Sequence, residues 1–268
     1  SVNVAYTTIT DDLGLAAATA ETIAEVTSAV AISDNRTVGA LRADSNISGS
    51  FTITIDTGGM IISTPAAVGR TISANLAARA GKEFVLYSGG GGAAIHAING
   101  TVAWDSGFTK FGPRTVSLNA DNSLTLTGDI SINEGSLVVG GDNRLGAPAN
   151  RVFLNGGNLR PNANMAISRE IVVNAGGGQL TNDGNRTIDY AGVISGAGAL
   201  TVNSVNGNNG VNRLTGTAAN TFESGLIINN GILEFTRNDQ LGALPNGTRH
   251  DRGHVVINEP GGTNATLR

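Results

Sequence analysis

The chain has 268 residues, of which 40% are apolar, enough for a continuous core, while only 14% are charged and 4% aromatic. A net charge of −4 offers no basic surface for phosphates, which argues against nucleic-acid binding and against a polybasic membrane patch. The absence of cysteine excludes disulfides and thiol chemistry and mildly favours an exported protein. Thirty-eight glycines, with frequent Asn, Thr and Ser, favour short strands and turns over helices.

Neither a signal peptide nor a transmembrane run is recognised in these residues. No apolar run reaches the length of a transmembrane helix. The chain begins with Ser1 rather than Met, shows no signal peptide and stops inside repeat-like sequence. We therefore expect these residues to be the ordered part of a longer protein.

The first thirty residues are the least regular part of the sequence. Val2–Thr10 alternates weakly between apolar and polar residues, which favours a strand. Residues 13–31 are ambiguous, because they are rich in Ala and place Ile23, Val26 and Val30 at helical spacing, yet Thr and Val are also frequent. Helix and strand both stay open for this segment.

A clear period of two begins near Arg36. In Phe51–Ile55 we expect Phe51, Ile53 and Ile55 to point inward and the two threonines between them to point outward. Similar short runs follow at Met60–Ser63, Thr71–Leu76, Glu83–Tyr87, Ala94–Ile98, Thr101–Trp104, Val116–Leu118, Leu124–Thr127, Ile130–Ile132, Leu137–Val139, Val152–Leu154, Ile171–Val173 and Ile188–Tyr190.

The clearest alternation lies in Gly225–Phe235. Leu226 and Ile228 point one way while Ile227 and Asn229 point the other; after the next bend Leu233 and Phe235 resume the inward face. That bend is the Asn-Gly pair at 230–231, a dipeptide that suits positive φ.

These strands are too short to bury an apolar face alone. Stacking successive turns of the same kind would cover each face, which predicts a parallel β-solenoid, right-handed on general chirality grounds. At roughly 20 residues per turn, the chain would form about a dozen rungs.

An internal duplication supports this prediction. The segment 135–148 (GSLVVGGDNRLGAP) corresponds to 231–245 (GILEFTRNDQLGALP), with Gly135 matching Gly231 at an offset of 96. Upstream, LTG at 126–128 matches LTG at 214–216 at an offset of 88, and downstream VFLN at 152–155 matches VVIN at 255–258 at an offset of 103. The offsets change while the strand pattern persists, as expected of loops on a solenoid.

The duplicated regions resemble a known family, the autotransporter-associated β-strand repeat, also called the passenger-associated transport repeat. The first copy matches it at Gly107, Thr109, Lys110, Gly112, Leu124, Leu126, Gly128, Gly135, Leu137, Leu145 and Gly146. The second copy matches it at Gly196, Gly198, Leu200, Thr201, Leu214, Gly216, Asn220, Thr221, Gly225, Gly231, Leu233, Leu241 and Gly242, and departs from it at Val202, where Lys is usual.

The resemblance implies a right-handed parallel β-helix, export, and an extracellular or bacterial cell-surface location, and it implies no catalytic site. We expect residues 1–268 to form a single solenoid, in which residues 1–106 are the N-terminal rungs and residues 107–268 are the autotransporter-type repeats. The secretion route stays open.

Many parallel β-helices act on polysaccharides, and such a site needs two or three carboxylates close together. Asp11 and Asp12 are adjacent and would face opposite sides of a strand. Asp183 and Asp189 are six residues apart, with Arg186 between them and Tyr190 alongside. We favour a purely structural interpretation, in which Asp183 lies in a turn and Asp189 in the strand that follows it. We assign no catalytic residue.

The histidines give no metal site. His96 lies in an alternating run and reads as an ordinary strand residue. His250 and His254 are four apart, which would suit a metal only on a helix, and Gly253 argues against one.

The glycine runs Gly89–Gly92 and Gly176–Gly178 lack the Lys-Ser/Thr of a phosphate loop and the Asp of a calcium-binding nonapeptide. Asn182-Asp183 is a possible calcium corner, but one carboxylate is too few to assign it. Stacked asparagines are a structural alternative, with Asn155, Asn158 and Asn174 as candidate ladder members. No cofactor is expected.

We expect a non-enzymatic extracellular structural protein, a rigid surface projection or a protomer of a filament or surface layer that self-associates end to end or laterally. The alternatives are an autotransporter passenger acting as an adhesin and, from a different class, a carbohydrate-binding or carbohydrate-degrading β-helix. Trp104 is the only Trp, which disfavours a sugar groove lined by aromatic residues. A trimeric phage-type fibre is weaker still, because no trimer clasp is evident. Contact with a cell surface or a glycan stays open.

Overall fold

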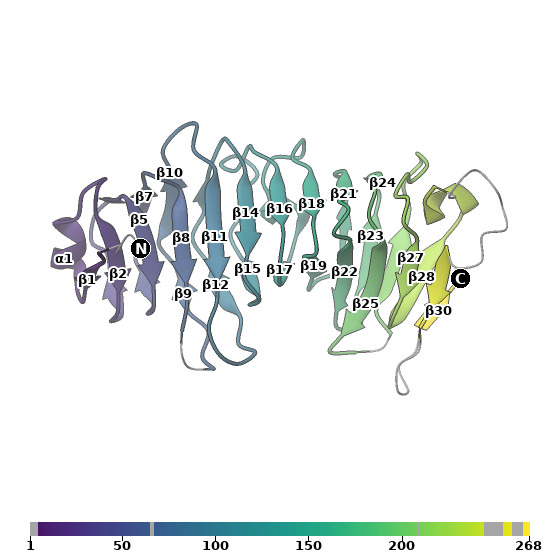
Figure 1. Cartoon of the computed structure of the whole chain (residues 1–268), viewed down its shortest axis with the longest axis horizontal. Coiled ribbons are helices and arrows are strands. Elements are labelled where there is room, and N and C mark those ends of the chain that lie inside the picture. Colours follow the sequence, from purple (N-terminus) through teal and green to yellow (C-terminus); the bar gives the residue numbers. More distant parts are fainter. Residues whose placement is uncertain (1–4, 65–66, 208, 244–253, 259–264) are drawn as a thin grey trace. The chain divides into compact units, whose positions relative to one another are not determined.

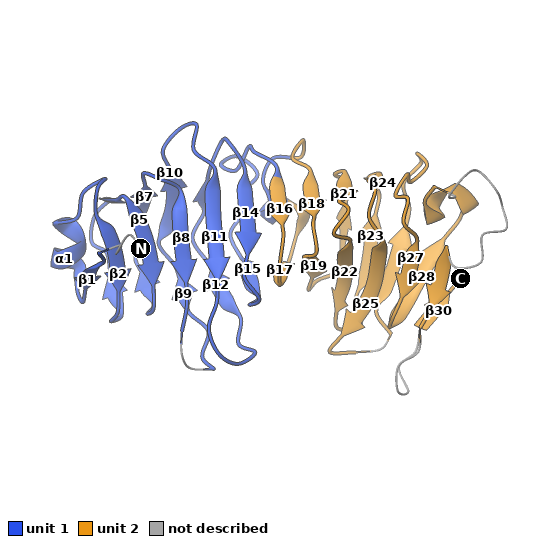
Figure 2. Cartoon of the chain, viewed as in Figure 1, with its two compact units in different colours: residues 1–129, 143–147 blue, residues 130–142, 148–268 orange. Residues whose placement is uncertain are grey.

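The computed structural model describes residues 5–64, 67–207, 209–243, 254–258 and 265–268 (Figure 1). Nearly all its regular structure is β-strand, and all the strand pairs given below are parallel. The chain divides into two compact units (Figure 2). Unit 1 contains residues 1–129 and 143–147, and unit 2 contains residues 130–142 and 148–268. The expected boundary at 106/107 rests on sequence pattern and stays a prediction.

Unit 1 has three parallel sheets, to which successive turns of the chain contribute strands. The first contains β1 (Thr7–Ile9), β2 (Ile23–Val26), β5 (Ala40–Ala43), β8 (Gly59–Ile62), β11 (Phe84–Ser88) and β14 (Phe108–Phe111). The second contains β3 (Val30–Ala31), β6 (Ile47–Ser48), β9 (Thr71–Ile72), β12 (His96–Ile98) and β15 (Val116–Leu118). The third contains β4 (Arg36–Val38), β7 (Thr52–Ile55), β10 (Asn75–Ala78) and β13 (Val102–Ala103).

Unit 2 repeats this plan. Its first sheet contains β16 (Ile130–Ile132), β18 (Val152–Leu154), β21 (Ile171–Val173) and β24 (Ile194–Ser195). Its second contains β17 (Ser136–Val139), β19 (Asn158–Pro161), β22 (Gly178–Asp183), β25 (Leu200–Val205), β27 (Leu226–Ile228) and β29 (Val255–Ile257). Its third contains β20 (Met165–Ile167), β23 (Thr187–Tyr190), β26 (Val211–Leu214), β28 (Gly231–Phe235) and β30 (Ala265–Leu267).

The predicted parallel β-solenoid is therefore confirmed, with about nine turns rather than about a dozen. The difference comes from turn length. Thr7 pairs with Ala24, an interval of 17 residues, whereas Gly231 pairs with Ala265, an interval of 34. Each strand position is kept while the loop between strands lengthens, because loop insertions cost little once the ladder is formed.

The core follows the predicted alternation. In β27, Leu226 and Ile228 are fully buried while Ile227 between them is half-buried and outward. Leu233 is also buried, but Phe235 is only half-buried. Phe51 corrects the prediction for its segment: it precedes β7 and is 37% exposed, while Ile53 and Ile55 are buried as expected. The alternation of buried and outward side chains begins only at Thr52, where β7 pairs with its neighbouring strands.

The ambiguous segment 13–31 contains both kinds of structure. The helix α1 (Asp12–Ala16) spans five residues and packs its buried Leu15 beside β1 and β4. Asp11 caps it, accepting a hydrogen bond from the Gly14 N–H at 2.8 Å. The helical spacing of the later apolar residues was misleading, because Val26 and Val30 point inward from two different strands, β2 and β3. Among the described residues, no helix is long and apolar enough to cross a membrane.

Two short 3-10 helices mark the duplication. η1 (Asp142–Leu145) and η2 (Asn238–Leu241) begin 96 residues apart, the offset expected from the sequence. Each is followed by a glycine with positive φ, Gly146 at 82° and Gly242 at 93°.

Candidate binding groove

A row of outward side chains crosses the first sheet of unit 1. Strand register places Glu25, Arg42, Ile61, Tyr87 and Phe111 side by side on consecutive strands. They share one face because each occupies the outward parity of its strand. The row changes along its length from a charged end to an aromatic end.

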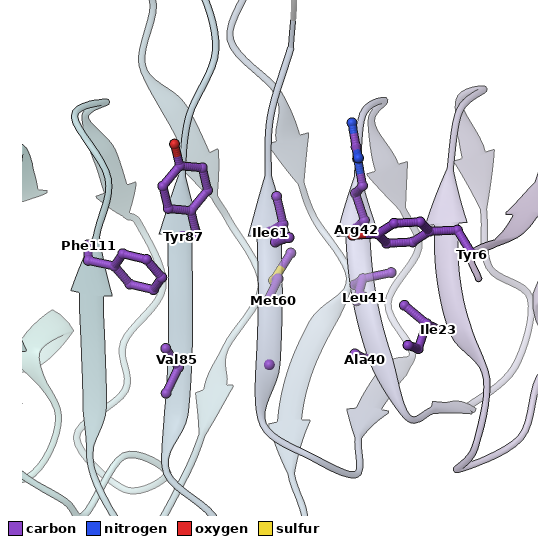
Figure 3. A pocket seen from close by; sticks show the side chains of 11 residues that line it. Tyr6, Ile23, Ala40, Leu41, Arg42, Met60, Ile61, Val85, Tyr87 and Phe111 are labelled. Carbon is purple, nitrogen blue, oxygen red and sulfur yellow. The ribbon is translucent and has the colours of Figure 1, made fainter. Parts of the chain in front are cut away.

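A second row, two residues earlier on each strand, forms the floor of a groove. Ile23, Ala40, Gly59 and Val85 are paired across β2, β5, β8 and β11. Ala40 and Gly59 carry almost no side chain, so the surface is hollow between the larger residues on either side. The resulting groove has a volume of about 370 Å³ (Figure 3).

The two ends of the groove have different chemistry. At one end the rings of Tyr87 and Phe111 lie with centroids 5.1 Å apart and planes tilted by 59°, a favourable aromatic geometry. At the other end the Arg42 guanidinium lies 5.4 Å from the centroid of the Tyr6 ring, which is 38% exposed. Figure 3 shows these four side chains along one face.

Carboxylates hold Arg42 in place at the charged end. Its Nη2 lies 2.9 Å from Asp44 Oδ2 and its Nε lies 3.2 Å from Glu25 Oε1. Hydrogen bonding to Asp44 raises the pKa of Arg42 against the opposing effect of burial. The groove therefore offers apolar and aromatic contact area with a fixed cation at its edge, which suits binding rather than catalysis.

The sequence analysis did not find this groove. The alternation of apolar and polar residues did indicate that Tyr87 and Phe111 point outward from β11 and β14. Aligning them with Ile61 and Arg42 required the register between turns of 19 to 26 residues, which the sequence pattern does not provide.

The candidate carboxylates do not form a pair. Asp183 ends β22 in the second sheet of unit 2, whereas Asp189 lies in β23 of the third sheet. Each is bound to an arginine of a neighbouring turn: Asp183 Oδ2 to Arg160 Nε at 3.0 Å, and Asp189 Oδ1 to Arg213 Nε at 2.6 Å. These ion pairs give both residues a structural role.

Two further residues considered in the sequence analysis, Tyr190 and Asp12, are also unsuited to proton transfer. Tyr190 points into the core, and burial raises the pKa of its hydroxyl far above the ordinary value. Asp12, the first residue of α1, bonds to Ser33 and Arg36, and these bonds lower the pKa of its carboxyl.

Each histidine in the described part of the chain makes hydrogen bonds within the fold. His96 is buried at the start of β12 and accepts at Nδ1 from the Arg70 N–H at 3.0 Å. His254 lies 2.9 Å from the Leu241 carbonyl through Nε2. His250 lies outside the described residues. In the described ranges, no group of three His, Cys, Asp or Glu could hold a metal.

The predicted asparagine ladder is not seen at the three candidate residues. Asn158 donates to the Ser136 hydroxyl at 3.1 Å, and no side-chain bond joins it to Asn155 or Asn174. Asparagine pairs between turns do occur elsewhere: Asn119 Nδ2 donates to Asn99 Oδ1 at 2.8 Å. The possible calcium corner is also occupied by protein contacts, since the Asn182 amide donates to the Arg186 carbonyl at 2.8 Å.

Comparison with known proteins gives one informative relative. No family model matches the chain, and no solved structure matches it. Over 111 residues it is 36% identical to the adhesin BmaC autotransporter of Brucella suis biovar 1 (strain 1330). The match covers 41% of this chain and 3% of that protein, so the chain spans a small fraction of the relative's length. The resemblance to autotransporter passengers is confirmed.

This resemblance and the fold agree with each other. The relative is named as an autotransporter adhesin, and both units of this chain are parallel β-solenoids. A stack of short parallel strands with a continuous Ile, Val and Leu core is the architecture expected of an autotransporter passenger.

Proposed function

We propose that this chain is a segment of a bacterial cell-surface protein in which the solenoid serves as a rigid, non-enzymatic projection. The observation that supports this most directly is the unbroken parallel pairing within each unit, for example β2 with β5 and β5 with β8. Every turn is hydrogen-bonded to the turns beside it and shares their core, so bending one turn disturbs its neighbours.

Surface location can be tested by cysteine labelling, because the chain has no cysteine of its own. Leu124→Cys places a thiol at a position that is 92% exposed, and Leu126→Cys places one at a fully buried position two residues away. With the full-length protein in its own bacterium, a membrane-impermeant maleimide should label the first variant on intact cells and the second only after denaturation. Labelling of Leu124→Cys only after lysis would contradict a surface location.

Adhesion is a second candidate function, favoured by the groove and by the relative that is named as an adhesin. The groove would make the contact, through Tyr87 and Phe111. Beads coated with the chain should attach to epithelial cell layers, and Tyr87→Ser with Phe111→Ser should reduce attachment several-fold. Phe153→Ser is the matched control, because Phe153 is a half-buried outward aromatic residue of β18 in unit 2. An equal loss in the control would rule out a specific role for the groove.

A carbohydrate-degrading function is disfavoured by the ion pairs of Asp183 and Asp189. We expect neither the parent chain nor a variant lacking one of these carboxylates to cleave a polysaccharide. Release of reducing ends from any polysaccharide by the chain, abolished in Asp189→Asn, would overturn the non-enzymatic proposal.

Self-association is a further part of the proposal. Ladders of parallel strands end in unpaired backbone groups, which can pair with another copy. Negative-stain imaging over a concentration series should show filaments or sheets if the chain assembles. Isolated particles at every concentration, with a monomer mass by light scattering, would leave the displayed passenger as the remaining form.

A further inference from the structure

A buried cationic corner lies in unit 1, where three successive turns leave the first sheet and enter the second. We define it by Arg70, Ser88, His96, Lys110 and Arg114. Four of these are buried, and Arg70 is half-buried. The corner interrupts a core otherwise filled mostly by Ile, Leu and Val. Positive charge inside a protein needs compensation by hydrogen bonds and by negative charge.

Lys110 is held by the loop that follows its own strand. Its Nζ donates to the carbonyls of Gly112 and Arg114, each at 2.6 Å. These bonds hold the turn that brings Arg114 into the corner. They also place the ammonium and the guanidinium of Arg114 on the same short loop.

The imidazole of His96 is surrounded by positively charged side chains, which affect its pKa. Its Nδ1 accepts from the Arg70 N–H, and its Nε2 lies 3.2 Å from the Gly89 carbonyl, so the neutral ring with the proton on Nε2 satisfies both contacts. Burial lowers the pKa of His96, and the charges of Arg114, Arg70 and Lys110 lower it further. Both arginines therefore act on the same imidazole.

Arg114 has unused hydrogen-bond donors although it is only 5% exposed. Its Nη1 donates to the Gly91 carbonyl. Its Nε and Nη2 are buried without a partner. In the part of the chain that the structure describes, no carboxylate forms an ion pair with this guanidinium.

Two neighbouring side chains also have buried polar atoms without a hydrogen-bond partner within the described ranges. Arg70 donates through Nη2 to the Thr64 hydroxyl at 2.9 Å, but its Nε is buried without a partner. The Ser88 hydroxyl is also buried and without a partner. The corner thus has four unused polar atoms on three residues, all of which can donate a hydrogen bond.

Comparison with another buried arginine, Arg169, shows that Arg114 lacks a carboxylate partner in the described chain. Arg169 in unit 2 is as buried as Arg114, at 4% exposure, and its Nε donates to Asp142 Oδ1 at 2.8 Å. The half-buried Arg36 also has a carboxylate partner, Asp12, at 2.7 Å. Of the two buried arginines among the described residues, Arg169 is paired with an acid and Arg114 is not.

We propose that the cationic corner binds a small oxyanion, such as sulfate, phosphate or a carboxylate, between the guanidinium groups of Arg114 and Arg70. Planar guanidinium donors match the oxygen spacing of these anions. The Ser88 hydroxyl donates a further bond. The anion supplies the counter-charge that Asp142 supplies to Arg169. This site is separate from the groove and does not depend on the proposed surface function.

The glycine run Gly89–Gly92 allows the loop to close over this corner. Gly90 has φ of 110°, and a Cβ there would lie 2.1 Å from the Thr64 carbonyl oxygen. Gly92 has φ of 75°, and a Cβ there would lie 2.5 Å from Ala67 Cβ. Only glycine fits both the conformation and the space at these positions.

Isothermal titration calorimetry tests this site directly. The full 268-residue chain, dialysed into a zwitterionic buffer of low chloride content, is titrated separately with sodium sulfate, phosphate and acetate. We expect saturable binding of one anion per chain. Arg114→Met and Arg70→Met should each weaken it at least tenfold, and Arg186→Met, an exposed arginine of unit 2, should leave it unchanged. The order of the three affinities identifies the preferred oxyanion.

Ser88→Asp provides an independent test if the arginine variants do not fold. An aspartate at this buried position would supply the missing counter-charge within the chain. We expect a higher melting temperature than the parent chain in anion-free buffer and no further rise when sulfate is added. The parent chain should show such a rise, saturating at the concentration found by calorimetry.

Two results would overturn the proposal. One is the absence of saturable binding of all three anions to the parent chain. The other is an equal rise in melting temperature when sulfate is added to the parent chain and to Ser88→Asp, because non-specific stabilisation by excluded salts does not depend on this residue.

Discussion

Arg169 and Asp142 form an ion pair between adjacent turns of unit 2, in which the arginine side chain is 1% exposed and the aspartate side chain 26%. Arg169 also donates to the Asp142 and Asn150 carbonyls at 2.9 and 3.1 Å. Arg169→Met should lower the free energy of unfolding by about 3 kcal/mol, because it removes the buried partner of the ion pair and a donor to the Asp142 and Asn150 carbonyls. Urea unfolding followed by circular dichroism measures this. Arg186→Met, at an exposed position, should change it by less than about 0.5 kcal/mol.

Asn122 gives a second prediction. This buried side chain accepts from the Val102 N–H at 2.8 Å and donates to the Arg144 carbonyl at 2.9 Å, so it joins the turn before it to η1 in the turn after it. Asn220 makes the same two bonds to the start of β24 and to η2. Asn122→Ala and Asn220→Ala should each cost on the order of 3 kcal/mol, because buried backbone groups lose their partners.

The control for both variants is Asn155→Ala, since Asn155 is exposed. Its urea midpoint should match that of the parent chain. Equal midpoints for all three variants would show that Asn122 and Asn220 do not hold adjacent turns together.

The solenoid was predictable because its signal is local. Inward residues such as Leu226 and Ile228 recur with period two, and the duplication repeats η1 and η2 at the same offset. Phe51 shows the limit of the signal. Its parity matches that of Ile53, but it lies before the paired strand and is therefore 37% exposed.

The contacts between turns could not be predicted in the same way. Whether Asp183 faces Asp189 or Arg160 depends on loop lengths between strands, and one residue of slip reverses every side chain. The groove and the cationic corner depend on the same register. Asn122 carried a weak signal, because it precedes its 3-10 helix by a distance similar to that of Asn220, which lies in the repeat pattern.

Phe84 gives a third prediction, with a built-in spectroscopic reporter. Its ring stacks on Trp104 with centroids 3.7 Å apart and planes 19° apart, inside unit 1. Phe84→Ala should lower the free energy of unfolding by about 3–5 kcal/mol through the cavity it leaves, and Trp104 emission should shift to longer wavelength. Phe51→Ala should cost less, on the order of 1–2 kcal/mol, because Phe51 is 37% exposed and its removal leaves no cavity in the core. Similar losses in both variants would contradict the corrected orientation of Phe51.

The stability of the chain should fall on mild acidification because of His96. Burial lowers its pKa from the ordinary value of 6.5, and the charges of Arg114, Arg70 and Lys110 lower it further, against the opposing hydrogen bond to Gly89. Below about pH 6.5 the unfolded chain therefore binds a proton that the folded chain does not, which favours unfolding. The His96 contribution is fully present above about pH 7 and is lost as the pH falls, with a slope of at most about 1.4 kcal/mol per pH unit.

Urea unfolding at steps between about pH 5 and 7, in buffer without oxyanions, measures this slope, which should be smaller in His96→Asn than in the parent chain. Asparagine keeps an acceptor for the Arg70 N–H but does not titrate. An identical slope in both proteins would assign the acid sensitivity to other groups. Adding the oxyanion that binds the cationic corner should also reduce the slope in the parent chain, because a bound negative charge near His96 raises its pKa towards the unfolded value.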